Sequence, residues 1–170
     1  MFAYGTATWV DEITFRMMAA MVTANVAPKS DVLDYIGPLD DLLESPHSKR
    51  FIVVAPTSLP VIPGHVAGAG FGHTNFNATW RVDFALQLME RDNRTSKLMA
   101  VNDSRSMTSF VRTGAAVMQG FSPAQAADAD VGITLQPIRL VRMDFSNRRP
   151  ASGWAFCHTE WEVLFRSDFS

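Results

Sequence analysis

The residues of this sequence that could perform acid–base chemistry are few, and the clearest pair lies near the C-terminus. His158 and Glu160 are separated by one residue, so strand alternation would place both side chains on the same face of a sheet. A histidine beside a carboxylate can act as a general base, but two polar residues on an exposed strand face are also an ordinary structural pattern. The sequence contains no serine-hydrolase elbow, zinc-hydrolase motif, P-loop or redox dithiol. We therefore predict no catalytic residue.

Thiol and metal chemistry have equally little support in the sequence. Cys157 is the only cysteine, which excludes an intramolecular disulfide and fits a reducing compartment. Its position in a strand-like run, next to Phe156, is typical of a small buried hydrophobe. His65 and His73 are eight residues apart, but the sequence offers no further ligands that would complete a zinc site with them. We predict neither a metal nor a cofactor.

The least regular part of the sequence runs from Pro56 to Ala78, with three prolines and four glycines. Its GAGFG segment, Gly68 to Gly72, has the spacing of a partial dinucleotide fingerprint, which requires a strand before it and a helix after it. The next element is a strand, so we reject this interpretation. Loops of this length in compact domains are usually functional or mobile. We predict an interaction arm or an extended hairpin over 56–78, with His65, Phe71 and His73 as candidate partner contacts.

Two aromatic stretches indicate the centre of a sheet. Thr79–Glu90 and Gly153–Arg166 both contain Trp-x-Val-x-Phe, and aromatic or branched residues occupy every second position. Period two predicts strands with one face against a core. The apolar run Phe51–Ala55 predicts a further buried strand. Ile133–Phe145 is predicted to be a strand interrupted at Pro137, a residue that favours an edge or a bulge.

Three stretches have helical features. Trp9–Asn25 carries apolar residues at three- and four-residue spacing, with Thr8 as the predicted N-cap. Ser104–Met118 shows the same periodicity and contains Gly114, which would let a neighbouring element approach closely. Ser30–Glu44 is weaker, since a Gly-Pro pair breaks it into two short pieces.

The expected fold is an α+β domain spanning residues 1–170. We predict a mainly antiparallel sheet packed by an N-terminal helix and a central helix. A length of 170 residues fits one domain with its own core. The net charge of −2 gives no electrostatic case for sequence-specific nucleic-acid binding. No segment has the length and apolarity of a membrane span.

Two segments of opposite charge are candidate contact surfaces. The acidic one lies within Ser30–Glu44 and includes Asp40 and Asp41. The basic one surrounds the predicted final hairpin and contains Arg139, Arg142, Arg148 and Arg149. Each could equally be a solvated surface. If they contact each other between copies, the self-complementarity suits a head-to-tail ring.

The order of these elements, from about Thr8 to Asp168, resembles that of the tail terminator (tail completion) proteins of long-tailed bacteriophages, which belong to the neck of the particle. The likeness includes the style of the last two strands, PIRLVRMDF and GWAFCHTEWEVLF. It implies a small structural protein that assembles as a hexameric ring. Such a ring caps the tail tube, stops its polymerisation and offers a surface to the head-side connector. The long arm over 56–78 departs from the family pattern, which puts its partner in doubt.

The resemblance implies a location in the virion tail or neck, after assembly in the host cytoplasm. The implied partners are further copies of the chain, the tail tube protein and the head-side connector or stopper protein, with the genome passing through the ring. Another head–tail connector or a tail tube subunit is a close alternative. A small-molecule-binding or isomerase-like domain, with Asp83 or His158 in a pocket, is an alternative from another class. The discriminating feature is whether four aromatic residues fill a solid core or line a cavity: Trp80, Phe84, Trp161 and Phe165.

Overall fold

The computed structural model describes residues 5–43, 49–58, 73–88, 101–121, 133–134, 137–146 and 153–168. The elements along the chain are α1 (Gly5–Thr23), η2 (Lys29–Asp31), β1 (Val32–Asp34), η3 (Leu39–Leu42), β2 (Arg50–Ser58), β3 (His73–Gln87), α2 (Val101–Gln119), β4 (Ile133–Thr134), β5 (Arg139–Ser146) and β6 (Trp154–Asp168). No helix within the described ranges is long and apolar enough to cross a membrane.

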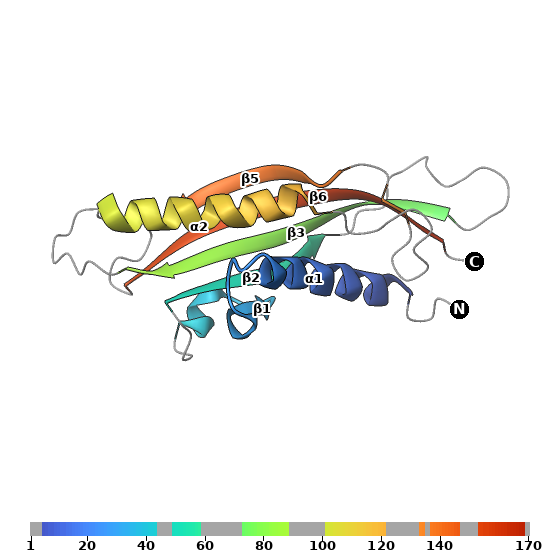
Figure 1. Ribbon diagram of the computed structural model, residues 1–170. Helices are drawn as coiled ribbons and strands as arrows, with labels where there is room; N and C mark the ends of the chain where they lie inside the picture. The colour runs from blue at the N-terminus through green and yellow to red at the C-terminus, as the bar shows by residue number, and fades with distance from the viewer. Residues whose placement is uncertain are drawn as a thin grey trace.

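The strands form one sheet in the order β1-β2-β3-β6, and both β4 and β5 pair with the far side of β6. Only the β1–β2 pair is parallel. The two aromatic strands β3 and β6 pair along their whole length, from His73 opposite Asp168 to Gln87 opposite Trp154. Figure 1 shows β5 and β1 at opposite margins of this sheet. The predicted α+β fold with a mainly antiparallel sheet is confirmed.

Both helices pack on the same face of the sheet, with α1 along β1 and β2 and α2 against β3 (Figure 1). Alternate residues of β3 and β6 point into the layer between sheet and helices. Trp80, Phe84 and Trp161 are completely buried there. Four aromatic residues were chosen to distinguish a solid core from an open cavity, and three of them therefore belong to a solid core. The side chain of Phe165 lies outside the described residues.

The two core tryptophans carry N–H donors that are satisfied inside the core. Trp80 Nε1 donates to Thr14 Oγ1 of α1 at 3.0 Å, and Trp161 Nε1 donates to Thr159 Oγ1 at 2.9 Å. Each threonine hydroxyl in turn donates to a backbone carbonyl, at 2.8 and 2.6 Å respectively. A buried N–H without a partner costs about 1–3 kcal/mol. These threonines therefore let an aromatic core hold two indoles without that penalty.

Gly114 permits the close approach of α2 to the sheet, as the sequence predicts. A Cβ atom at this position would lie 2.2 Å from Cε1 of Phe84. The Phe84 ring also meets the Phe110 ring of α2 edge-on, with centroids 5.4 Å apart. The absence of a side chain at Gly114 thus sets the distance between α2 and β3.

A smaller apolar cluster covers part of the opposite, helix-free face of the sheet. Its buried members are Phe51, Val53, Ala85 and Trp154. Apart from Phe156 of β6, the residues packed against them come from the segment containing β1 and η3: Leu33, Tyr35, Leu39, Leu42 and Leu43. This packing explains why that segment folds back along the edge of the sheet.

Ser30–Glu44 was predicted to be helical, and this is wrong over its described part. It contains the strand β1 between two short 3-10 turns, η2 and η3. Val32 points to the helix-bearing layer and Leu33 to the helix-free cluster. The burial of these two adjacent side chains on opposite faces, together with the pairing of β1 to the edge of β2, outweighs a weak helical propensity.

Three predicted boundaries also need correction. Helix α1 begins at Gly5, so Thr8 lies inside it and is not its N-cap. Helix α2 begins at Val101, before the predicted start at Ser104. The arm is shorter than predicted, because β2 extends to Ser58 and β3 starts at His73. What remains of it, 59–72, lies outside the described residues.

Candidate functional site

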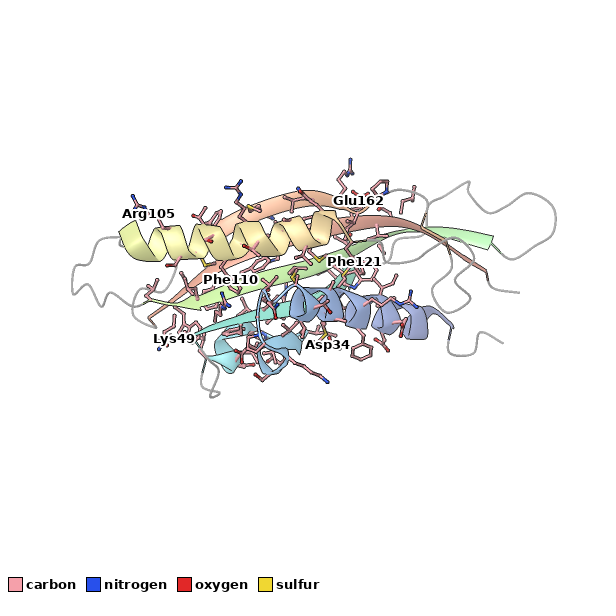
Figure 2. All side chains as sticks on the ribbon, viewed as in Figure 1. Asp34, Lys49, Arg105, Phe110, Phe121 and Glu162 are labelled. Atoms are coloured by element: carbon pink, nitrogen blue, oxygen red, sulfur yellow. The ribbon has the colours of Figure 1, made fainter. Side chains whose placement is uncertain are left out.

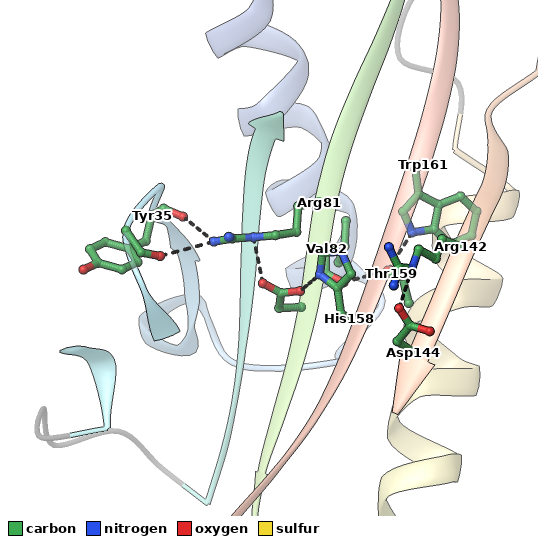
Figure 3. A network of polar contacts seen from close by, with 10 residues as sticks. Tyr35, Arg81, Val82, Arg142, Asp144, His158, Thr159 and Trp161 are labelled. Carbon is green, nitrogen blue, oxygen red and sulfur yellow. Dashed lines mark hydrogen bonds and ion pairs between the residues drawn. The ribbon is translucent and has the colours of Figure 1, made fainter. Parts of the chain in front are cut away.

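The helix-free face carries a polar network that links β3, β6 and the β1 edge (Figure 3). At its centre, Asp83 of β3 is 2 % exposed. Its Oδ1 lies 2.5 Å from Nδ1 of His158, directly across on β6, and its Oδ2 lies 2.8 Å from Nε of Arg81 in an ion-pair contact. The Arg81 guanidinium also donates to the carbonyls of Tyr35 and Gly37, at 3.3 and 3.5 Å.

The network engages both oxygens of the Asp83 carboxylate. Burial raises the pKa of Asp83, while the hydrogen bond from His158 and the charges of Arg81 and His158 oppose that rise. One carboxylate thus ties together two strands, and Arg81 extends the link to the loop after β1. The arrangement acts as a clamp across the sheet.

Sequence reasoning placed His158 with Glu160, and the structure corrects this pairing. The two side chains do share a face, but the carboxylate that contacts His158 belongs to Asp83. A histidine held by a buried carboxylate has the geometry of an oriented base. The nucleophiles next to it in sequence, Cys157 and Thr159, are buried on the opposite face of the sheet. Strand alternation therefore separates the histidine from the adjacent groups it could activate.

Cys157 is a buried core residue, as predicted. Its side chain is completely buried beneath the helices. Burial, with smaller contributions from the charges of Asp83 and Asp144, raises the pKa of its thiol to about 12. A thiol in this state is a poor nucleophile at neutral pH. Over the described ranges, no three His, Cys, Asp or Glu side chains gather closely enough to hold a metal ion.

A cleft of about 560 Å³ lies on the helix-bearing side, between the first half of α2 and the ends of the strands beneath it. It is lined by Asn25, Val26, Arg50, Leu86, Arg105, Ser106, Ser109, Phe110 and Thr113. The Arg50 guanidinium lies over the Phe110 ring, 5.3 Å from its centroid, and Figure 2 shows Arg105 and Phe110 on the same half of α2. The residues nominated for a small-molecule pocket, Asp83 and His158, are not part of this lining.

The predicted basic rim is only partly a positive surface. Arg139 and Arg142 are exposed on β5, but each has an acidic neighbour. Arg139 lies 2.5 Å from Glu162, and Arg142 forms an ion pair with Asp144. The hydrogen bond from Arg139 is the main cause that lowers the pKa of Glu162. Arg148 and Arg149 lie outside the described residues.

The more distinctive feature of β5 is apolar, and sequence reasoning missed it. Val141, Met143 and Phe145 are exposed by 53 %, 37 % and 54 % respectively. The register shifts between Leu140 and Arg142, which marks a bulge on this edge strand. The sequence did contain a signal for this exposure, because an apolar strand follows Pro137. A strand at the edge of a sheet has a neighbour on one side only, so some of its apolar side chains can remain exposed.

The opposite margin of the sheet carries exposed acidic and apolar groups. Tyr35 donates its hydroxyl to Asp41 at 2.9 Å, and Ile36 is 73 % exposed. Asp34 is exposed, and its pKa is raised by partial burial and by the charge of Asp11 on α1. Figure 2 shows Asp34 and Glu162 on opposite sides of the molecule.

Not every acidic residue of this segment is a surface residue. Asp31 is 3 % exposed, which corrects the picture of a uniformly solvated acidic surface. The side chain of Asp40 lies outside the described residues, as do His65, Phe71 and the side chain of His73. Of the nine predicted contact residues, the structure therefore gives side-chain partners for three: Arg139, Arg142 and Asp41.

The fold of this chain is similar to that of a known virion protein, although its sequence matches no known family. No family model matches the sequence, and no curated protein matches it. A chain in a solved structure described as "Virion of native gene transfer agent (GTA) particle" is similar to it with a TM-score of 0.55 and 9 % sequence identity. The match covers 98 % of this chain and 100 % of that chain. At this identity the likeness shows a shared fold, over almost the complete length of both chains.

Proposed function

We propose that this chain is a structural protein of a virus-like particle and acts as a tail terminator. In this role, several copies form a ring, of six by analogy with the family it resembles. The ring ends the tail tube and presents a surface to the head-side connector. The proposal needs no cofactor and assigns the chain no catalytic role.

The observation that supports this proposal most strongly is the full-length fold match to a chain of a virion particle. Local similarity would be expected for many α+β domains, but this likeness extends over 98 % of this chain and 100 % of the other chain, with a TM-score of 0.55. Of the elements on which the resemblance rests, α1, β2, β3, α2, β5 and β6 occur in the expected order, whereas 30–44 contains β1 where a broken helix was expected. This agreement supports the proposal.

The interior of the protein also favours assembly over a ligand pocket. Trp80, Phe84 and Trp161 fill the layer between sheet and helices. Asp83 and His158, which a pocket enzyme would use, hold the strands together on the other face. The described residues thus use their aromatic and titratable groups for structure, and leave apolar side chains exposed at the margins of the sheet.

Inactivating the gene in its host and imaging the released particles would test the role. Loss of a terminator should give tails of irregular, excessive length and heads that carry no tail. Loss of a tail tube subunit would instead abolish tails, and loss of a head-side connector would leave tails of normal length unattached. Tailed particles of normal length and full yield would contradict all three of these structural roles. Complementation with the intact gene is the control.

A further inference from the structure

We propose that copies of this chain join head to tail, with the β5 edge of one copy against the β1 edge of the next. This inference rests on the proposed ring and specifies which surfaces close it. Its starting point is the distribution of large apolar side chains that are exposed. Of the side chains that the structure describes, five are of this kind: Phe15, Ile36, Val141, Met143 and Phe145.

These five side chains fall into two groups at opposite margins of the sheet. Val141, Met143 and Phe145 belong to β5. Ile36 follows β1 by two residues, at the other margin. Phe15 belongs to α1, the helix that lies along β1 and β2. Phe15 lies one helical turn after Asp11, on the same side of α1, and Asp11 is close enough to Asp34 of β1 to raise its pKa.

The two margins lie at the same level along the strand direction. The Cα partners across the sheet connect Asp34 to Met143 through Val54, Val82 and Thr159. They likewise connect Val32 to Phe145 through Ile52, Phe84 and Cys157. If the series is continued by one residue past the end of β1 at Asp34, Tyr35 comes to the level of Arg142.

This common level determines what kind of assembly the contact would build. A contact between two different surfaces of the same chain is heterologous, and it produces either a closed ring or an open helical filament. A filament requires displacement along the axis at each step. Because the two margins are linked by one series of Cα partners, the next copy needs little displacement along the strand direction. A contact of this kind is compatible with a closed ring, and the twist of the sheet contributes to the rotation between copies.

The two margins also match in chemistry. Met143 and Phe145 lie opposite Thr159 and Cys157 of β6 and point to the same face of the sheet. This is the helix-bearing face, on which α1 and its residue Phe15 also lie. On the helix-free side, the exposed guanidinium of Arg142 lies at the level of Tyr35, whose hydroxyl binds Asp41. Apolar groups would thus meet apolar groups, and the Arg142–Asp144 ion pair would face the Tyr35–Asp41 hydrogen bond.

Within the part of the chain that the structure describes, the outer edges of β5 and β1 carry no further strand. Among the described strands, β5 pairs only with β6, and β1 pairs only with β2. Exposed, apolar edge strands are avoided in monomeric proteins because they pair with other chains. Since β1 runs parallel to β2 while β5 runs opposite to β6, β5 of one copy and β1 of the next would be antiparallel.

Cross-linking at two exposed positions tests the contact directly. The double variant Ile36→Cys/Val141→Cys places one thiol on each margin. The native Cys157 is buried with a thiol pKa of about 12, so it should not react under native conditions. Treatment with a short bis-maleimide should give a ladder of covalent oligomers that ends at one closed species. Both substituted side chains are more than half exposed, so folding should be preserved.

The single variants Ile36→Cys and Val141→Cys are the matched controls, and each should give no species larger than a dimer. If the double variant also stops at dimers, the proposed contact is wrong. Negative-stain images of the wild-type protein separate this failure from failure of the proposed function. Rings without the ladder would overturn the β5–β1 contact alone, whereas neither rings nor a ladder would count against both proposals.

Discussion

At the scale of single residues, the described polar groups are arranged to hold strands together. Asp83 illustrates this, because its two oxygens contact His158 and Arg81 while only 2 % of the residue is exposed. A buried charge that loses one of its partners is strongly destabilising. The Asp83 network therefore fixes the β3–β6 pairing as well as the position of the loop that follows β1.

The titration of Asp83 gives a prediction with a definite sign. Burial raises its folded-state pKa above the ordinary value of 3.8, so between these two values the folded protein binds more protons than the unfolded chain. The free energy of unfolding therefore falls as the pH rises through this window. We expect Asp83→Asn to lose that contribution. The difference in unfolding free energy, wild type minus variant, should then fall as the pH rises above about 4.

Urea unfolding at a series of pH values measures this difference. Glu162→Gln is a control of opposite sign, because the hydrogen bond from Arg139 lowers the pKa of Glu162 below its ordinary value of 4.5. The wild-type-minus-variant difference for Glu162 should rise with pH, weakly, since surface ion pairs contribute little. If the Asp83 difference also rises with pH, the account of its burial is wrong.

The Asp83–His158 contact could not be predicted from the sequence. The two residues are 75 positions apart, and their contact depends on the register of β3 with β6. A shift of one residue would move His158 to the other face. Alternation did predict that His158 shares a face with Glu160. It gave no way to choose between a carboxylate on the same strand and one on the neighbouring strand.

At the scale of elements, the distance between α2 and the sheet depends on a position without a side chain. Gly114 faces the ring of Phe84, and an added Cβ would lie 2.2 Å from that ring. Contacts this short require the helix or the ring to move. The ring is completely buried, so it has little room to do so.

We expect Gly114→Ala to lower the free energy of unfolding by about 1–3 kcal/mol, the usual cost of overpacking a core. Gly120→Ala is the matched control near the end of the same helix. There the added Cβ would meet only backbone oxygens, at 3.6 and 3.8 Å, so a change within about 0.5 kcal/mol is expected. Chemical denaturation of both variants measures the difference. Equal stability of the two would contradict the close packing of α2.

The elements that could be predicted are those whose burial is periodic. Alternation in Thr79–Glu90 and Gly153–Arg166 identified β3 and β6, since each has one face against a continuous core. Only three residues form β1, too few for a period to show, and its existence depends on the edge of β2. The exposure of Val141 and Phe145 was missed because apolar residues in a strand normally indicate burial. Pro137 suggested an edge or a bulge, but the sheet order was needed to show which side chains that edge leaves uncovered.

At the scale of the whole molecule, the two margins of the sheet carry different side chains. They lie at the same level along the strand direction. Three exposed apolar side chains lie along β5, and two more lie at the side of β1. In the proposed ring these side chains would be covered by the neighbouring copy. That the chain forms one domain over residues 1–170 remains a prediction.

The mass of the purified wild-type protein in solution tests the central claim of ring assembly most directly. Light scattering over a wide range of concentrations should show the 18.8 kDa chain giving way to one discrete species, of six copies if the family analogy holds. Negative-stain images of that species should show a ring with a central hole. A mass that stays at one copy up to the highest concentration, and also in the presence of purified tail tubes, would contradict ring assembly.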